Sequence, residues 1–431
     1  MRKIFITFCL LLTAAVSADF GAETAAAETR ANSAAASGYA ETRADARAAL
    51  GYAETRALWV TRFELIDTPN IPELVRRAAE ANFNTLFVQV CGRGTAFYDS
   101  KILPKDTQVS HDALALVLAE ARKYKIGVHA WINTLYVWSD PEPPASPEHV
   151  VNKHPEWLMT LRGDARNKYL DPAIPEAREY IRSIYLEVAR NYAVDGVHLD
   201  YVRYPGAGAG FTEYSRQTFK RLYGVDPLAL QQNKEIALRL FGESEYQQQM
   251  ERWDSWRRES VNSLVRGIFY ELAVAAPQVI LTAAVLPDPD SAAKNNFQDW
   301  AAWMRGGYID AVAPMIYDRD AKVVQKQTIR AAELADEHSV PVFIGLGAWR
   351  RSSDAIVSDV EFLRRARREM NYKYLRGVIL FSYDGIKNVP NYLEHIKRHV
   401  FTESAAQSPP REKRFLSEEN PSLNSGELIT G

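Results

Sequence analysis

Residues 195–205 have the sequence DGVHLDYVRYP, which reads as a buried strand followed by a turn. Its period-two alternation places the valine and the leucine on one side of a strand, toward flanking helices, and His198 and Asp200 on the other, toward the interior. An inward carboxylate near the end of a strand is unfavourable unless it has a partner or a chemical role. Asp200 is therefore the first candidate functional residue, and Arg203 and His198 are the nearest groups that could pair with it.

On both sides of this strand, short apolar runs alternate with longer amphipathic stretches, which is typical of βα units. Strands are expected at 58–63, 85–90, 127–133, 196–202, 280–286, 311–317, 341–346 and 377–383. Helices are expected at 72–81, 112–123, 175–191, 253–275, 298–304, 323–337, 354–370 and 390–399. Eight strands, each followed by a helix, predict an α/β fold of the (β/α)8 TIM-barrel type. A doubly wound open sheet remains the alternative, because sequence does not give strand order.

The longest connections follow the third and fourth expected strands. The first contains the Pro-rich run PEPP at 141–144, and the second, about 205–253, begins with GAGAG at 206–210. Both follow the C-terminal end of a strand, the end at which barrel loops build active sites. We expect these long loops to wall a cleft.

The two ends of the chain differ from the rest in composition. Residues 1–18 have the basic start, apolar run and small-residue end of a secretory signal peptide, and the run is too short to span a bilayer. Residues 19–56 form a low-complexity leader in which GYAETRA occurs twice, and residues 403–431 are expected to be a disordered tail. The barrel is thus expected at 57–402. The protein is expected to be exported, to the periplasm or outside the cell, with no membrane span after cleavage.

Charge and motifs exclude several classes of protein. Fifty-two Lys+Arg against 54 Asp+Glu leave a formal net charge of -2, so no nucleic-acid partner is expected. Cys91 is the one cysteine beyond the signal segment, which leaves no disulfide within the chain. No phosphate-binding loop, HExxH helix, GxSxG elbow or cysteine pair occurs, and no cofactor or metal is expected.

Aromatic residues gather at the expected strand ends: Trp59, Trp131, Trp138, Tyr201, Tyr204, Tyr317, Trp349 and Tyr383. Rings with polar tips suit a polysaccharide, which offers flat apolar faces rimmed by hydroxyl groups. Each ring alone is better explained by ordinary packing. Their clustering is what favours a sugar-binding cleft.

Carboxyl groups follow other strands as well. Glycoside hydrolysis needs two of them, about 5 to 9.5 Å apart across the scissile bond. Asp318 is the preferred partner of Asp200, because it ends a strand two places on around the barrel and follows Tyr317. Asp288 and Asp384 remain alternatives, although both lie in sequences that commonly form turns.

Several segments together resemble the glycosyl hydrolase-like 10 family of exported bacterial proteins. They are LWVT at 58–61, QVCGRG at 89–94, HPEWL at 154–158, LDP at 170–172, the string at 195–205 and APMIY at 313–317. The resemblance runs in order over about 57–390. It implies a TIM-type barrel that acts on polysaccharide in the cell envelope or outside it. Some relatives cleave peptidoglycan glycan strands from which the stem peptides have been removed.

The family is similar to the α-galactosidase superfamily, which has a nucleophilic Asp on strand four and an acid/base Asp on strand six. Carried over by position, these roles fall on Asp200 and Asp318. The first transfer rests on a matching motif and the second on strand order. Cys91 departs from the family pattern, since relatives often carry Arg before Gly-Arg-Gly.

The sequence therefore predicts an exported glycoside hydrolase with a metal-free, two-carboxyl mechanism. Asp200 is the expected nucleophile or base and Asp318 the expected acid with a raised pKa. Substrate binding or positioning is expected from His198, Arg203, Asn133, Trp131, Tyr201, Tyr317 and Asp384. A non-catalytic glycan-binding or scaffold protein on the same barrel is the alternative. Transglycosylation by the same carboxylates, the stereochemical outcome and the oligomeric state stay open.

Overall fold

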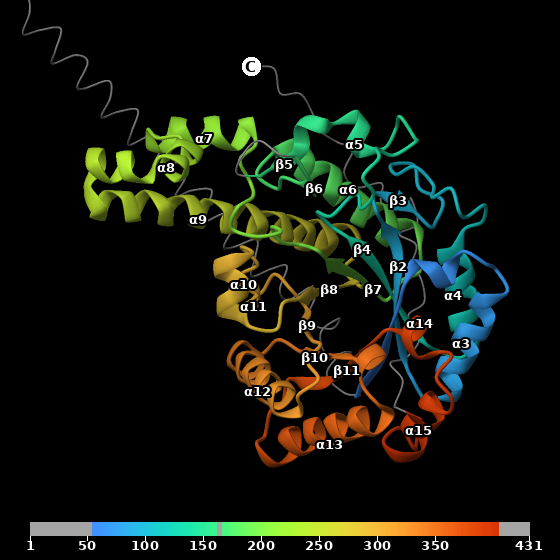
Figure 1. Cartoon of the computed structure of the whole chain (residues 1–431). Coiled ribbons are helices and arrows are strands. Elements are labelled where there is room, and N and C mark those ends of the chain that lie inside the picture. The colour runs from blue at the N-terminus through green and yellow to red at the C-terminus, as the bar shows by residue number, and fades with distance from the viewer. Residues whose placement is uncertain (1–53, 162–165, 405–431) are drawn as a thin grey trace, which may run out of the picture.

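The structure is a computed structural model that describes residues 54–161 and 166–404 (Figure 1). The expected signal peptide, nearly all of the leader and nearly all of the tail lie outside these residues. Strand β1 begins at Thr55, so the last residues assigned to the leader, including the end of the second GYAETRA copy, belong to the barrel. No helix in the described segments is long and apolar enough to cross a membrane.

Within the described residues, eight parallel strands close into a barrel. They are β1 (Thr55–Val60), β2 (Thr85–Gly92), β4 (Gly127–Asn133), β7 (Gly196–Asp200), β8 (Ile280–Val285), β9 (Ala311–Ile316), β10 (Val342–Gly347) and β11 (Leu375–Phe381). β1 pairs with both β2 and β11, so the first and last strands join and the sheet has no open edge there. The predicted TIM-type barrel is confirmed, and the open doubly wound sheet is wrong.

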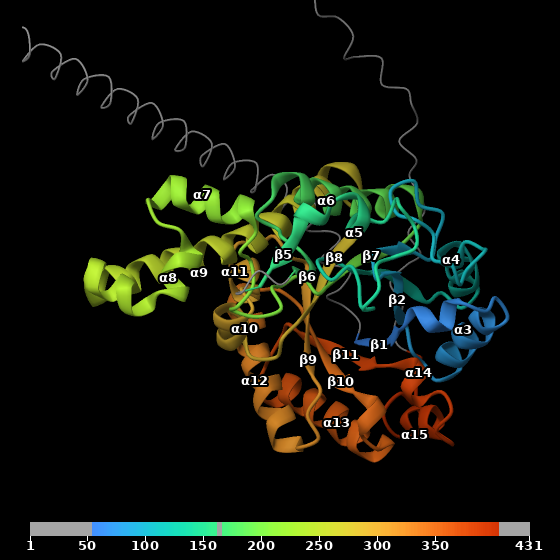
Figure 2. The ribbon, with the colours of Figure 1, turned by 45° about the horizontal axis from the view of Figure 1, so that its top comes forward.

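Helices surround the strands (Figure 2). They are α3 (Asn70–Glu80), α4 (Ala113–Lys123), α6 (Pro175–Asn191), α9 (Lys234–Ala275), α11 (Trp300–Arg305), α12 (Ala321–His338), α13 (Ser353–Glu369) and α15 (Tyr392–His399). Alternate side chains of the strands point outward and pack against these helices, as Val197 and Leu199 do. The other side chains fill the barrel interior, where Trp59, Phe87 and Phe343 form a second apolar cluster.

The two long connections have different structures. After β4 come α5 (Val150–Lys153), η2 (Pro155–Trp157) and the antiparallel pair β5 (Leu158–Thr160) and β6 (Arg166–Leu170). After β7 come α7 (Glu213–Tyr223), α8 (Pro227–Gln232) and the first part of α9.

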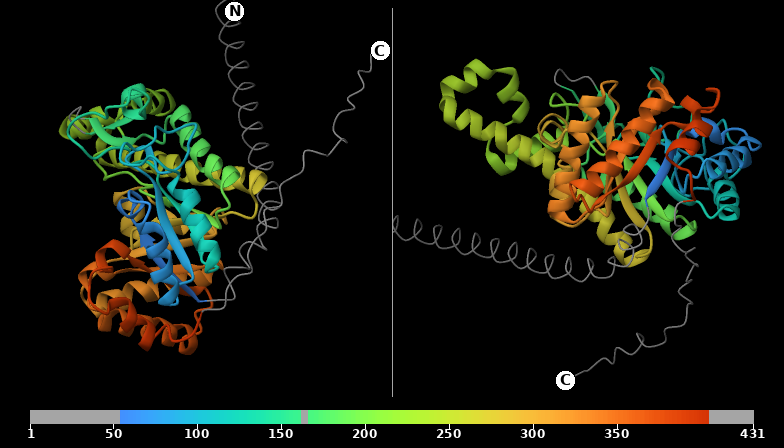
Figure 3. Two further views of the ribbon diagram at one scale, coloured as in Figure 1. Left: turned by 90° about the vertical axis from the view of Figure 1, so that its right-hand side faces the viewer. Right: turned by 90° about the horizontal axis from the view of Figure 1, so that it is seen from below.

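These last helices form an arm that projects sideways from the barrel (Figures 1 and 3). α9 starts 19 residues before the expected helix 253–275, at Lys234, and Gly242 interrupts it with non-helical dihedral angles (φ 75°, ψ 165°). The expectation that this insertion walls a cleft therefore needs correction, because most of it extends away from the strands.

Short elements at the strand ends set the geometry of the barrel mouth. β3 (Thr95–Ala96) folds back on β2, η1 (Arg62–Leu65) follows β1, and η3 (Ala348–Arg350) follows β10. α10 (Pro289–Asn295) follows β8 and α14 (Tyr383–Ile386) follows β11. β1 thus ends earlier than expected, because the chain turns into η1 at Arg62.

Candidate active site at the barrel mouth

Asp200 is the last residue of β7, and its carboxyl group lies at the C-terminal end of the barrel. Only 6% of the residue is exposed. Oδ2 accepts a hydrogen bond from Trp131 Nε1 at 3.1 Å, and Oδ1 accepts one from the Tyr201 N–H at 2.7 Å. Arg203 Nη1 lies 3.7 Å from Oδ1, which makes an ion pair. The structure therefore gives this inward carboxylate the Arg203 partner that the sequence suggested.

Two opposing effects act on the proton affinity of Asp200. Burial raises its pKa, whereas the charge of Arg203 and the hydrogen bonds from the Tyr201 N–H and the Trp131 indole lower it; the net direction is upward. Such a carboxyl group exchanges its proton at a higher pH than a solvated Asp. This is a property that acid–base chemistry near neutral pH requires.

His198, from which substrate binding or positioning was expected, lies inside the barrel and contacts neighbouring side chains. The side chain is completely buried, and Nε2 accepts a hydrogen bond from Trp59 Nε1 at 3.2 Å. Nδ1 then carries the proton and donates to Thr282 Oγ1 at 2.8 Å. Burial holds the pKa of His198 well below its usual range, so the ring is neutral. Its role in this structure is to fix Trp59.

A row of polar side chains crosses the mouth beside Asp200. Asn133 is the β4 residue aligned with Asp200, and its Oδ1 accepts from Gln89 Nε2 at 3.2 Å. Gln89 Oε1 in turn accepts from the Arg62 N–H at 3.1 Å. The sequence reasoning selected Asn133 but missed Gln89 and Arg62. Gln89 is the first residue of the QVCGRG segment, and this segment of the family resemblance could have pointed to it.

Tyr201 turns the chain sharply as it leaves β7. Its φ of 52° is uncommon for a residue with a large side chain, which explains why the strand ends at Asp200 and not at Val202. The Tyr201 ring lies between two neighbours: the Arg203 guanidinium, 4.6 Å from its centroid, and the Tyr136 ring at 5.0 Å. This turn keeps the ring at the mouth.

An aromatic wall stands on the β9–β11 side of the mouth. Tyr317 contacts Trp349 edge-on at 5.0 Å between ring centroids and Phe381 at 5.4 Å, while Phe381 also lies 6.3 Å from Trp131. Trp349 is 43% exposed, which is unusual for tryptophan. Three other rings of the expected set, Trp138, Tyr204 and Tyr383, are buried packing residues.

The remaining carboxyl candidates have hydrogen-bond partners of their own. Asp318 is exposed, and its Oδ1 accepts the Asp320 N–H at 2.8 Å in the turn before α12. Asp384 accepts from Thr61 Oγ1 at 3.1 Å, and Asp288 caps α10 by accepting the Ser291 N–H at 2.7 Å. No hydrogen bond or ion pair joins these three to Asp200 in the described part of the chain. Asp288 thus has the turn role that its sequence suggested.

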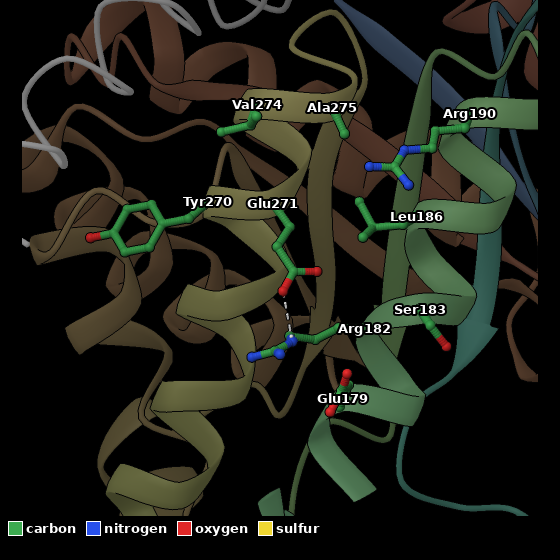
Figure 4. Close-up of a pocket in the computed structure, with 9 residues that line it drawn as sticks. All are labelled: Glu179, Arg182, Ser183, Leu186, Arg190, Tyr270, Glu271, Val274 and Ala275. Atoms are coloured by element: carbon green, nitrogen blue, oxygen red, sulfur yellow. Dashed lines mark ion pairs between the residues drawn. The ribbon is translucent and has the colours of Figure 1, made fainter. Parts of the chain in front are cut away.

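Among residues 54–161 and 166–404, no group of three His, Cys, Asp or Glu side chains is arranged to hold a metal ion. A surface groove lies elsewhere, between α6 and α9 on the outside of the barrel (Figure 4). There Arg182 Nε pairs with Glu271 Oε1 at 2.8 Å, and none of the expected site residues lines the groove.

The chain is similar in sequence to a known protein family and to characterised bacterial proteins. The sequence profile described as glycosyl hydrolase-like 10 matches residues 54–363, which confirms the resemblance seen in the sequence. Glycosyl hydrolase YngK of Bacillus subtilis is 25% identical over 377 residues, covering 78% of this chain and 69% of YngK. Glycosyl hydrolase DigH of Escherichia coli K12 is 28% identical over 305 residues, and the match covers 62% of each protein.

Among solved structures, the glycoside hydrolase domain of PgaB (BpsB) from Bordetella bronchiseptica is similar with a TM-score of 0.56 at 15% identity. The match covers 80% of this chain and 99% of that domain. At this identity the likeness shows the fold alone.

Proposed function

Because the chain belongs to the glycosyl hydrolase-like 10 family, we propose that it is an exported glycoside hydrolase that cleaves polysaccharide with Asp200 at the centre of its site. The family and the barrel support a glycoside hydrolase-type function. The observation that carries the proposal is the buried Asp200 carboxyl group at the end of the fourth barrel strand, hydrogen-bonded to Trp131 and paired with Arg203. Barrel enzymes place their catalytic groups at this position.

In the proposed mechanism Asp200 acts in its ionised form, as nucleophile or as base. The Trp131 indole and the Tyr201 N–H hold its two oxygens and stabilise the negative charge. Arg203 adds a positive charge on the same side. These contacts fix the carboxylate relative to a sugar bound between Trp131 and Tyr317. Because the reacting groups are already oriented, less positional entropy is lost on the way to the transition state.

Asp318 is the proposed acid, which protonates the leaving oxygen. It lies on the loop after β9, at the C-terminal end of the barrel strands where the cleft is expected. Asp384, which accepts a hydrogen bond from Thr61 after β1, is the alternative candidate for the acid.

The proposed substrate is the peptidoglycan glycan strand without stem peptides. The predicted signal segment at residues 1–18 supports a site of action in the cell envelope or outside the cell. The half-exposed Trp349 and its neighbour Tyr317 supply apolar ring surface for sugar faces. The polar row of Asn133 and Gln89 supplies amide groups for hydroxyls.

The test uses glycan strands freed of stem peptides by an amidase, with release of soluble saccharides followed by chromatography and mass spectrometry. Asp200→Asn is expected to lower kcat by about 10²- to 10⁴-fold, the range for loss of an acid–base or nucleophilic group. Asp290→Asn, an exposed carboxylate near the same face, is the matched control and should leave the rate unchanged. Equal rates for wild type and Asp200→Asn would refute the assignment.

Asp318 and Asp384 are separated by the same assay. Loss of activity in Asp318→Asn with retention in Asp384→Asn supports Asp318 as the acid, and the reverse result moves the role to Asp384. Activity that survives in both variants rejects both assignments.

A non-catalytic glycan-binding protein is the second candidate, and one observation favours it: Asp318 is solvent-exposed and does not contact Asp200. A binding protein would hold glycan strands at equilibrium without releasing products. Its affinity would depend on Trp131 and Trp349 and would be unaffected by Asp200→Asn.

A further inference from the structure

Exposed apolar side chains gather on the arm that α7, α8 and the first part of α9 form. In the described part of the chain, six of the thirteen exposed large apolar residues lie on this arm: Tyr214, Leu222, Tyr223, Ile236, Leu240 and Phe241. None of the six belongs to the two small apolar clusters that make up the interior of the arm. A single exposed apolar residue needs no explanation, whereas a concentration of them marks a surface that contacts another molecule.

Two of these side chains lie on one face of a short helix. Gly242, with a φ of 75°, interrupts α9, so residues 234–241 form two helical turns ahead of the kink. Ala237 packs into the interior of the arm. Ile236 and Leu240, which are one turn apart and therefore share a face, are 55% and 73% exposed. Together they form an apolar strip on the solvent side of this helix.

Opposite charges lie along one side of the strip. Glu235 and Arg239 are both exposed, and each directly precedes a residue of the strip. Because successive residues are about 100° apart around a helix, the two charges lie on the same flank, one turn apart. In the described part of the chain, neither side chain forms a hydrogen bond or an ion pair. The strip is therefore bordered by one negative and one positive group that a partner could pair with.

The charge of the arm and its place in the fold argue against other occupants. Residues 213–245 carry five Lys or Arg and five Asp or Glu, whereas helices that lie on membrane surfaces are rich in Lys and Arg. The undescribed ends of the chain join the barrel beside the start of β1, where the Arg56 side chain donates to the Glu403 carbonyl oxygen. The arm leaves the barrel after the C-terminal end of β7, at the opposite end of the parallel strands.

We propose that this arm pairs with the same arm of a second copy of the chain, by antiparallel packing of the two strips about a two-fold axis. Such an axis brings identical surfaces together with their directions reversed. Ile236 of each copy then packs against Leu240 of the other, and Glu235 of each copy lies next to Arg239 of the other. The surface is complementary to itself in both apolar residues and charge.

The contact is small, so the expected association is weak. Stable complexes bury about 800 Å² on each partner, and smaller interfaces belong to transient contacts. A strip on a two-turn helix, with Leu222 and Tyr223 nearby in the same arm, provides less area than that. We therefore expect a dimer with a Kd on the order of 10 to 100 µM. This inference does not depend on the proposed hydrolase activity.

Sedimentation equilibrium of the chain without residues 1–18, from about 1 to 300 µM, tests the dimer. The wild-type mass should rise from that of one chain to that of two. Leu240→Asp places a charge on the strip and should raise the Kd at least about 10-fold. Val274→Asp is the control, because Val274 is 64% exposed near the other end of α9, and it should keep the wild-type Kd. A wild type that stays monomeric throughout, or that grows beyond two chains, overturns the proposal.

Charge reversal tests the two-fold arrangement itself. Glu235→Arg and Arg239→Glu each place like charges opposite one another in a pair of identical chains, so each variant alone should be monomeric. An equimolar mixture of the two variants should dimerise, because every contact between the unlike chains then joins opposite charges. An ion pair within one helix cannot produce this result, since neither variant carries both signs at these two positions. A mixture that stays monomeric overturns the antiparallel pairing.

Glu361→Arg and Arg365→Glu, on α13, are the matched controls. Glu361 and Arg365 are an exposed Glu and Arg with the same one-turn spacing, outside the arm. Each control variant should dimerise with the wild-type Kd. Loss of the dimer in either control would indicate a general effect of net charge and would overturn the assignment of the interface to the arm. If Leu240→Asp does not fold, the mixture of the two charge-reversed variants decides the proposal.

Discussion

At the scale of single residues, the surroundings of Asp200 make a prediction about pH. The positive charge of Arg203 lowers the pKa of Asp200 against the effect of burial. A nucleophile or base must be ionised, so activity is lost as the pH falls through this pKa. Arg203→Gln removes the charge, raises the pKa further, and should move the acidic limb of the kcat profile to higher pH by about one unit or more.

The kcat profile of wild type and variant between pH 3 and pH 9 checks this prediction. Trp131→Phe keeps the ring but removes one hydrogen bond to Asp200, and should move the limb in the same direction by less. A limb that stays in place in Arg203→Gln would show that Asp200 is not the group that titrates.

Among the secondary-structure elements, the turn that carries Trp349 is anchored by contacts with α13 and α15. Arg351 follows η3 and forms an ion pair with Asp359 of α13, in which both side chains are only 4% exposed. Tyr392 OH donates to the Ala348 and Arg351 carbonyl oxygens at 3.1 and 3.0 Å. The exposed ring therefore stands on a turn fastened to two helices, which makes it a fixed surface for a sugar.

Asp359→Asn is expected to destabilise the protein by about 3 kcal/mol, because it leaves a buried guanidinium without its counter-charge. Burial raises the pKa of Asp359 to about 6, so urea unfolding is measured at pH 8, where the pair is ionised. Asp354→Asn, on the same helix but 82% exposed and paired with His395, should cost less than about 1 kcal/mol. Equal effects of the two changes would contradict the role given to the buried pair.

The elements and the site were not equally predictable from the sequence. All eight barrel strands follow from short apolar runs, because a strand between a barrel interior and a helix layer must bury both faces. Alternation gives the direction of a side chain but not its depth, so the sequence does not reveal that His198 is fully buried and hydrogen-bonded to Trp59. The arm of α7, α8 and early α9 was not among the expected helices, and its apolar residues form two small clusters of their own, apart from the main core. Arg62 and Gln89 were missed because they contact each other across separate segments of the chain, and such contacts produce no recognisable spacing in the sequence.

At the scale of the whole molecule, stability depends on closure of the barrel, since β1 joins the last strand to the second. Gly377 of β11 faces Thr55 across this seam with a φ of 149°, and a Cβ atom there would lie 2.0 Å from the Thr55 carbonyl oxygen. Gly377→Ala must therefore open the seam or strain the backbone, and we expect it to cost about 3 kcal/mol.

The lower stability of Gly377→Ala should appear as one cooperative urea transition with a lower midpoint. A closed barrel is expected to unfold as a single unit, because each strand is paired on both sides. Gly206→Ala is the control, since a Cβ atom there meets nothing within 4 Å. Its midpoint should match that of the wild type. Two separate transitions in Gly377→Ala would instead mean that the segments on either side of the seam unfold independently, and that closure by β1 does not carry the stability of the barrel.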